Sequence, residues 1–135
     1  MPRAVLDPGI LVSALITPTG ASAKLLRAAR EGNFDLVISG LLLEELEVVL
    51  LRDKFRRYLD LKGVSAGIRL ILDEGQMVPD PAGGPPVRCS DPDDDYLIAL
   101  AHREGAALVS GDRHLLELAG AIPVFSPGEF LAARL

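Results

Sequence analysis

The stretch "RAVLDPGILVSALI", residues 3–16, decides the fold class. A short apolar run ends in an acid, Asp7, and a proline then opens a short helical segment. Apolar runs of this length between turn signals are typical of strands buried on both faces. The stretch therefore predicts a strand followed by a helix, which is the repeating unit of a parallel sheet covered on both sides.

The same alternation continues along the chain. Further strands are predicted at 34–39, 76–79, 107–111 and 122–126. Helices are predicted at 21–32, 40–52, 92–104 and 112–119, with broken helical character between 53 and 75. A capping box, "SPGE" at 126–129, begins the last helix. A Pro/Gly-rich loop, 80–90, is the segment we expect to be mobile. The pattern predicts an α/β fold with a mostly parallel central sheet.

Composition limits the remaining choices. The length of 135 residues predicts a single domain spanning residues 1–135, and the apolar content of 49% indicates a folded protein. The single cysteine cannot form an intramolecular disulfide, which suits a reducing compartment. The sequence shows no secretion signal and no window of about 18 uncharged apolar residues, so we expect a cytoplasmic protein without a membrane partner.

The stretch "DPDDDYLIALA", residues 91–101, contains four aspartates before an apolar run. Asp91 before Pro92 predicts a helix N-cap, and a first-turn position near the helix dipole accounts for Asp93 and Asp95. Asp94 differs, because at about 100° per residue it falls on the apolar face. A carboxylate that faces the core needs a partner, since burying an unpaired charge is costly.

Three more acids are predicted to point toward the same edge of the sheet. Glu45 falls within the apolar stripe of the helix 40–52, while Glu44 and Glu47 face away. Asp7 and Asp112 each follow a predicted strand, and ligands of parallel sheets bind beyond the carboxyl ends of strands. An arginine or a backbone N–H would satisfy any one of these acids. Four acids at one edge instead predict a hard cation, Mg²⁺ or Mn²⁺.

Four motifs in order, "AVLDPGILVSAL", "SGLLLEELEVVL", "DPDDDYLIALA" and "LVSGDRHLLEL", resemble those of the PIN-domain nucleases. The resemblance covers nearly the whole chain and is closest to the branch that contains bacterial toxins of toxin–antitoxin pairs. It implies a three-layer α/β/α domain and a Mg²⁺- or Mn²⁺-dependent endoribonuclease that cuts single-stranded RNA. It also implies an antitoxin as protein partner and admits a homodimer. The catalytic, metal-binding acids that it implies are Asp7, Glu45, Asp94 and Asp112.

Each acid has an expected role in this interpretation. Asp7 and Asp94 bind the principal ion, and Asp112 completes the site or holds a second ion. Glu45 binds metal through water or orients the attacking water. Ser110 and Asp91 are expected to support these ligands without binding the ion themselves.

Two positions depart from the family pattern. Relatives usually have asparagine two residues after the first aspartate, where this chain has Gly9. Many also have an acid where this chain has His114, which we interpret as a surface or capping residue that still has the reach to contact a phosphate or a water. Both departures bear on catalytic efficiency rather than on fold.

The acidic net charge of −5 argues against an ordinary basic nucleic-acid binder. Residues 52–69 nevertheless hold six basic residues and two acids. This run is either a solvated helical face or a surface for phosphates, for which we expect Arg52, Lys54, Arg56 and Arg57.

Two other classes of function remain open. A PIN-like module that binds RNA or a partner protein without turnover is compatible with Gly9. An aspartyl phosphoryl-transfer domain also places an aspartate after its first strand, but Gly9 stands where a phosphatase needs a second aspartate, and "IPVFSPGEF" lacks the lysine of a receiver domain.

Overall fold

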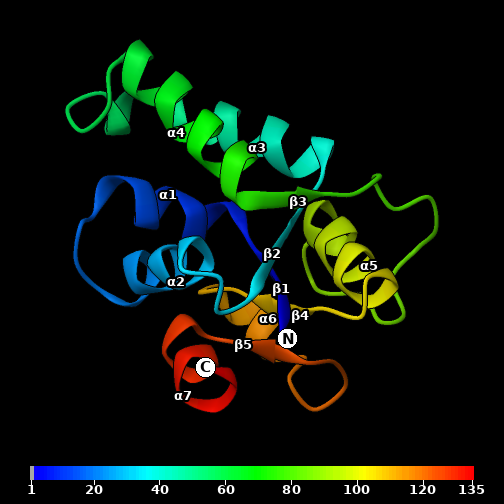
Figure 1. Cartoon of the computed structure of the whole chain (residues 1–135). Coiled ribbons are helices and arrows are strands. Elements are labelled where there is room, and N and C mark those ends of the chain that lie inside the picture. The colour runs from blue at the N-terminus through cyan, green and yellow to red at the C-terminus, as the bar shows by residue number, and fades with distance from the viewer. Residues whose placement is uncertain (1) are drawn as a thin grey trace.

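The computed structural model describes residues 2–135, which build a five-stranded sheet in the order β3-β2-β1-β4-β5 (Figure 1). The strands are β1 (Arg3–Leu6), β2 (Asp35–Ile38), β3 (Gly75–Met77), β4 (Ala107–Val109) and β5 (Val124–Phe125). All four strand pairings are parallel. The predicted α/β class with a parallel central sheet is therefore confirmed.

Helices cover both faces of this sheet. They are α1 (Pro8–Ile16), α2 (Ala21–Arg30), α3 (Gly40–Leu50), α4 (Leu61–Glu74), α5 (Asp95–Arg103), α6 (Arg113–Leu116) and α7 (Pro127–Arg134), with two 3₁₀ helices, η1 (Asp53–Phe55) and η2 (Pro92–Asp94). In Figure 1, α1 and α2 lie on one side of the sheet and α5 on the other, while α3 and α4 pack together beyond β2 and β3. This is the predicted three-layer α/β/α arrangement.

Local sequence signals set most of the helix ends. The Asp7 carboxylate accepts a hydrogen bond from the backbone N–H of Ile10 at the start of α1, and the Ser39 hydroxyl accepts one at the start of α3. Ser126 begins α7 with the predicted capping box. Gly32, just after α2, has a φ of 79°, a conformation that costs glycine little. Caps of this kind satisfy backbone groups that a helix end otherwise leaves unpaired.

The segment predicted as one helix over 92–104 is divided in the structure. Residues Pro92–Asp94 form η2, and α5 begins only at Asp95. The Asp91 carboxylate accepts a hydrogen bond from the Asp93 N–H, which closes the tight first turn. Asp94 therefore lies at the junction between the two helices rather than on a face of α5.

The core between these layers is mainly aliphatic, with Phe34 and Phe130 as its largest fully buried side chains. Leu6, Leu11, Leu36, Leu46 and Leu97 are among the largest fully buried side chains.

Within residues 2–135 no single helix is long and apolar enough to cross a membrane. The helices α1 and α2 reach the necessary length and apolar character only when they are taken together, and the chain bends by 91° between them.

The strand order places a topological switch in the middle of the sheet. The chain proceeds from β1 outward to β2 and β3, and then crosses to β4 on the other side of β1. In open parallel sheets, ligands bind where the order reverses, beyond the carboxyl ends of the strands. Here that position lies between the ends of β1 and β4, which are followed by Asp7 and by residues 110–112.

Candidate metal and nucleic-acid site

Asp7 is the most enclosed acid at the carboxyl edge of the sheet. Its residue surface is 3% exposed, and its backbone N–H still donates to the Val109 carbonyl, so the end of β4 fixes its position. Its carboxylate accepts hydrogen bonds from the Ile10 N–H at 2.9 Å and from the Ser110 hydroxyl. Burial nevertheless raises the pKa of Asp7 to about 6. The neighbouring carboxylates of Asp112 and Asp94 add to this rise.

Ser110 connects the two strand ends. Its buried hydroxyl donates to Asp7 and accepts the Asp112 N–H at 3.0 Å. Asp112 occupies the N-cap position of α6, but its carboxylate makes no capping hydrogen bond and is exposed. The structure thus leaves the Asp112 carboxylate available to a ligand.

Glu45 reaches the same edge from α3. It is half-buried, whereas Glu44 and Glu47 are exposed, so the predicted orientation of the three acids is confirmed. The Tyr96 hydroxyl of α5 donates a hydrogen bond to the Glu45 carboxylate and links the two helices. Burial raises the pKa of Glu45, and the Asp94 charge adds to that rise. Tyr96 was not predicted as a site residue, because its partner lies 51 positions away along the chain.

Asp94 is half-buried and pairs with His114 of α6, whose Nε2 lies 2.6 Å from Asp94 Oδ2. Burial raises the pKa of Asp94, although its hydrogen bond to His114 opposes the rise. The same hydrogen bond raises the pKa of His114. The interpretation of His114 as a surface or capping residue was therefore incomplete, because it did not predict the pairing with Asp94. The position of this histidine two residues beyond Asp112 was the available signal.

The account of Asp95 as only a first-turn acid was wrong. Asp95 is buried and accepts hydrogen bonds from Arg88 at 3.0 Å and from the Cys89 N–H at 3.2 Å. It thereby anchors the end of the loop 80–90, the segment that we expected to be mobile. Asp95 is more buried than Asp94 but is already fully paired, whereas Asp94 belongs to the carboxylates at the sheet edge.

A cavity of about 500 Å³ joins the four predicted acids. Its lining also includes Arg52 and Lys54, with apolar residues of α1 and α3. Gly9 lies in the first turn of α1, and a Cβ atom placed there would lie 3.4 Å from Asp7 Oδ1, an ordinary contact distance. The φ of Gly9 is not positive, so an asparagine would fit at this position without backbone strain.

The donor groups around this cavity fit a divalent cation. Among the described residues, its lining holds four carboxylates and no histidine or cysteine, and burial and mutual repulsion raise the pKa values of three of these carboxyl groups. A hard ion such as Mg²⁺ usually keeps several waters and touches one or two carboxylates directly, so the other acids act through water. Among residues 2–135, however, the three potential metal-ligand atoms that lie within 4.8 Å of one another belong to Asp91, Asp94 and His114.

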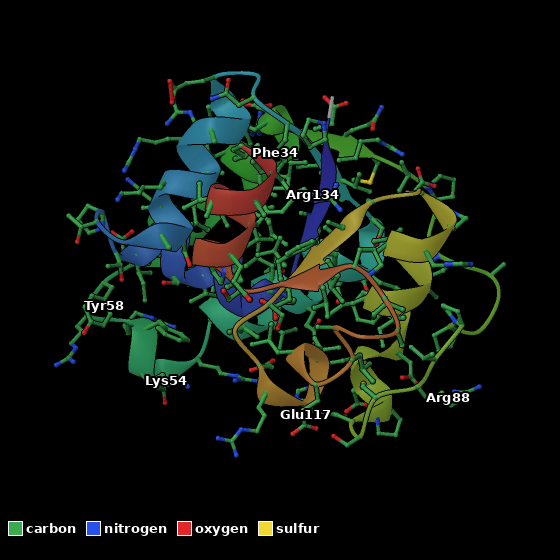
Figure 2. All side chains as sticks on the ribbon, turned by 90° about the horizontal axis from the view of Figure 1, so that it is seen from below. Phe34, Lys54, Tyr58, Arg88, Glu117 and Arg134 are labelled. Atoms are coloured by element: carbon green, nitrogen blue, oxygen red, sulfur yellow. The ribbon has the colours of Figure 1, made fainter. Side chains whose placement is uncertain are left out.

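The predicted basic residues lie beside and beyond the cavity. Arg52 and Lys54 line it, while Arg56 and Arg57 are exposed farther along the turn after α3. Arg57 stacks 4.9 Å from the ring centre of Tyr58, and Lys54 lies 5.1 Å from that of Phe55. Figure 2 shows Lys54 and Tyr58 on one projecting arm, on the opposite side of the molecule from Arg88. Cations and aromatic rings therefore alternate on an exposed segment.

Comparison with known proteins places this geometry in context. The model of a PIN-domain family, described as "PIN domain", matches residues 3–114. A sequence relative is the uncharacterized protein MJ1680 of Methanocaldococcus jannaschii, which is 28% identical over 116 residues, 86% of this chain and 74% of the relative.

Solved structures with a similar fold come from archaea and bacteria. PAE2754 from Pyrobaculum aerophilum superposes with a TM-score of 0.66 at 18% identity, over 97% of this chain and 88% of that one. VapBC2 from Rickettsia felis, solved bound to a DNA fragment from its promoter, gives 0.62 at 16% identity, over 92% and 98%. The PilT N-terminus domain protein SSO1118 from Sulfolobus solfataricus gives 0.60 at 18% identity, over 98% and 93%. These likenesses support the fold.

Proposed function

Because the chain belongs to the PIN-domain family, we propose that it is a Mg²⁺- or Mn²⁺-dependent endoribonuclease that hydrolyses single-stranded RNA. Family membership supports a nuclease. The observation that carries the finer proposal is the convergence of Asp7, Glu45, Asp94 and Asp112 on one cavity without a neutralising arginine or lysine ion pair among the described residues. Carboxylates without an arginine or lysine partner at a switch point suit a site that gains its counter-charge from a ligand.

We assign the metal to Asp7, Asp94 and Asp112. A divalent ion, when bound there, supplies positive charge beside the phosphate and promotes ionisation of water. Ser110 holds Asp7 in place through its hydroxyl and fixes the turn to Asp112 through its lone pair. Asp91 helps to position Asp94, because its carboxylate accepts the hydrogen bond that closes the preceding turn.

Glu45 is the residue that we assign to orient the attacking water. Its carboxylate lines the cavity, and the Tyr96 hydroxyl fixes one of its oxygens. The other oxygen is then free to accept a hydrogen bond from water. Since a protonated carboxyl accepts poorly, this role requires Glu45 in its charged form.

The basic and aromatic arm after α3 supports single-stranded RNA as substrate. Arg52 and Lys54 are placed to neutralise phosphates next to the acids, and Arg56 and Arg57 those farther along. Tyr58 is 51% exposed and carries a stacked guanidinium, a surface on which an unpaired base can stack. In a duplex the bases are already stacked and paired, so they cannot stack on the ring of Tyr58.

A toxin–antitoxin role belongs to the same proposal. VapBC2, one of the similar structures, is a protein solved with promoter DNA. By analogy of fold, we propose an antitoxin as partner of this chain and a homodimer as its assembly. Co-expression with the product of the adjacent gene, followed by purification through one tag, tests for this partner.

RNA cleavage in Mn²⁺ by the wild type, Gly9→Asn and Asp7→Asn tests the nuclease. We expect slow cleavage by the wild type, because Gly9 offers no side chain to orient Asp7. Gly9→Asn should be faster, since its amide would contact Asp7 Oδ1 and the backbone accepts it. Asp7→Asn should be inactive.

The same experiment separates the rival function. If none of the three proteins cleaves RNA while all bind it, the chain is a binding module without turnover. Cleavage by Asp7→Asn at the wild-type rate would contradict the assignment of Asp7. A variant at an exposed acid of the same region, Asp93→Asn, is the matched control and should cleave as the wild type does.

A further inference from the structure

We propose that Asp91, Asp94 and His114 form a metal-binding position of their own, which takes a first-row transition ion in preference to Mg²⁺. The structure brings the three side chains together from η2, its N-cap and α6. This position shares Asp94 with the carboxylate cavity and therefore rests in part on the proposed function. Asp91 and His114 do not line that cavity.

The ligand atoms of the three residues are close enough to converge on one ion. One ligand atom from each residue lies within 4.8 Å of both others, and His114 Nε2 lies 2.6 Å from Asp94 Oδ2. Ligands that surround a single transition ion at about 2.0–2.2 Å lie about 3–4 Å from one another. An ion bound there would replace the hydrogen bond between His114 and Asp94, and these two ligand atoms would move apart to about 3–4 Å.

The backbone holds the two aspartates at this spacing. The Asp94 N–H donates to the Asp91 carbonyl at 3.1 Å, and Asp91 Oδ1 accepts the Asp93 N–H at 3.1 Å. One oxygen of Asp91 is thus used by the turn and the other remains for a ligand. His114 is the second residue of α6 and follows Asp112, so the end of β4 fixes its approach.

The chemistry of the donors sets the preference. Two carboxylates and one imidazole suit Mn²⁺, Zn²⁺ and their neighbours, whereas Mg²⁺ favours oxygen ligands and binds imidazole poorly. The cavity that holds the four acids has no imidazole among its described lining residues and therefore gives Mg²⁺ no disadvantage. His114 therefore favours transition ions over Mg²⁺ at this position. A histidine that only formed an ion pair with Asp94 would not change which metal binds.

Calorimetric titration with Mn²⁺ and with Mg²⁺ tests the proposal on the intact chain. We expect His114→Ala to weaken Mn²⁺ binding by at least about tenfold, since loss of a group that only supports a ligand already costs 10- to 100-fold. Mg²⁺ binding should change by less than about threefold, because a nitrogen ligand contributes little to it. Asp91→Asn, which keeps the Oδ1 acceptor of the turn, should follow the same pattern, and Asp93→Asn should change neither affinity.

Nitrogen-15 spectra of the imidazoles give a direct readout. The chain has two histidines, so the exposed His102 is an internal control. Zn²⁺ should shift the Nε2 resonance of His114 and leave that of His102 in place, while Mg²⁺ should shift neither. A Zn²⁺ titration that leaves His114 unshifted would overturn the proposal.

The outcomes also distinguish this proposal from the proposed function. Equal weakening of Mn²⁺ and Mg²⁺ binding in His114→Ala would mean that His114 only orients Asp94, and would refute the separate position. Absence of RNA cleavage by the wild type, Gly9→Asn and Asp7→Asn would refute the nuclease assignment and leave the metal selectivity of His114→Ala unaffected.

Discussion

Acidic side chains have opposite electrostatic environments at the two ends of β1. At the amino end, Arg3 donates to the carboxylate of Glu104, and Arg103 pairs with the same carboxylate at 2.9 Å. Its hydrogen bond to Arg103 is the main reason why the pKa of Glu104 lies below its ordinary value. At the carboxyl end, Asp7, Glu45 and Asp94 have raised pKa values because of burial.

Under the proposed function, this difference separates acids that stabilise the fold from acids that bind a ligand. A neutralised carboxylate contributes to stability at neutral pH, whereas a buried one without a cation costs stability when it ionises. An uncompensated cluster therefore persists only where something else gains from it. Strongly perturbed pKa values in a cavity are for this reason a marker of functional sites.

The largest expected effect is the loss of divalent-metal binding in Asp94→Asn. Removing one charge of the cluster should weaken Mn²⁺ binding by about 100-fold or more, because a ligand and not merely its support is lost. Calorimetric titration measures the affinity. Asp95→Asn is the matched control, since Asp95 is paired with Arg88 and the Cys89 N–H and should leave metal binding intact. Equal losses in the two variants would contradict the distinction between them.

The next effect concerns the stability of the metal-free protein. The pKa of Asp7 is about 6 in the folded state, against an ordinary value of 3.8, so the native state binds more protons between these pH values. Its contribution to stability is therefore full at low pH and is lost as the pH rises through about 6. At 1.36 kcal/mol per pKa unit, the charged Asp7 costs at most about 3 kcal/mol above that pH.

Asp7→Asn should remove this cost and retain the fold. Its amide oxygen still accepts the Ile10 N–H, so the cap of α1 survives. In EDTA at pH 8 we expect the variant to be about 1–3 kcal/mol more stable than the wild type, a difference that shrinks toward pH 5. Urea denaturation at the two pH values measures it. A variant that is less stable at pH 8 would mean that the charged form of Asp7 is a structural cap.

The sequence predicted those parts of the site that depend on residues close together along the chain. Strand and helix order followed from local patterns, and the rule for strand ends placed Asp7 and Asp112 correctly at one edge. The orientation of Glu45 followed from helical periodicity in α3, where the helix is regular. Asp94 was selected by the same argument, but it lies in the 3₁₀ turn before α5, where that periodicity does not hold.

The contacts that escaped prediction join distant residues. His114 meets Asp94 across 20 positions, and Tyr96 meets Glu45 across 51. Arg88 and Asp95 are only seven apart, but the loop between them has no periodic pattern that indicates which charge turns inward. Such pairs depend on how the helices pack against the sheet and against one another. The sequence pattern of a single helix or strand does not indicate that packing.

A smaller effect is expected on the basic side of the cavity. Arg56 and Arg57 are exposed, and no ion pair within the described residues engages them. If each contacts one phosphate of single-stranded RNA, replacing both by glutamine should reduce the slope of log affinity against log salt by about 1.4. RNA binding measured over a range of salt concentrations tests this. Arg134→Gln, on α7 away from the cavity, should leave the slope unchanged.

Tyr96→Phe should reduce cleavage by about five- to thirtyfold, the equivalent of roughly 1–2 kcal/mol for a hydrogen bond to a charged group. The Tyr96 hydroxyl lowers the pKa of Glu45, so its loss should move the acidic limb of the pH–rate profile to higher pH. A merely structural role would lower the rate without moving that limb. Tyr58→Phe is the control, because its hydroxyl contacts Arg57 rather than an acid of the cavity.

The smallest effect is expected from Glu104→Gln at the other end of β1, and it should have the opposite sign to that of Asp7→Asn. The two arginines lower the pKa of Glu104, so its contribution is present above the unfolded pKa and is lost as the pH falls through the folded one. Because the arginines are partly exposed and screened by solvent, the pair contributes at most about 1 kcal/mol. Glu104→Gln should therefore be slightly less stable than the wild type at pH 8, with the difference vanishing as the pH falls through the lowered pKa of Glu104, and should leave metal binding unchanged. If urea denaturation instead shows a stabilised Glu104→Gln at pH 8, then both ends of β1 carry uncompensated acids, and the pKa contrast no longer marks the carboxyl edge as the functional one.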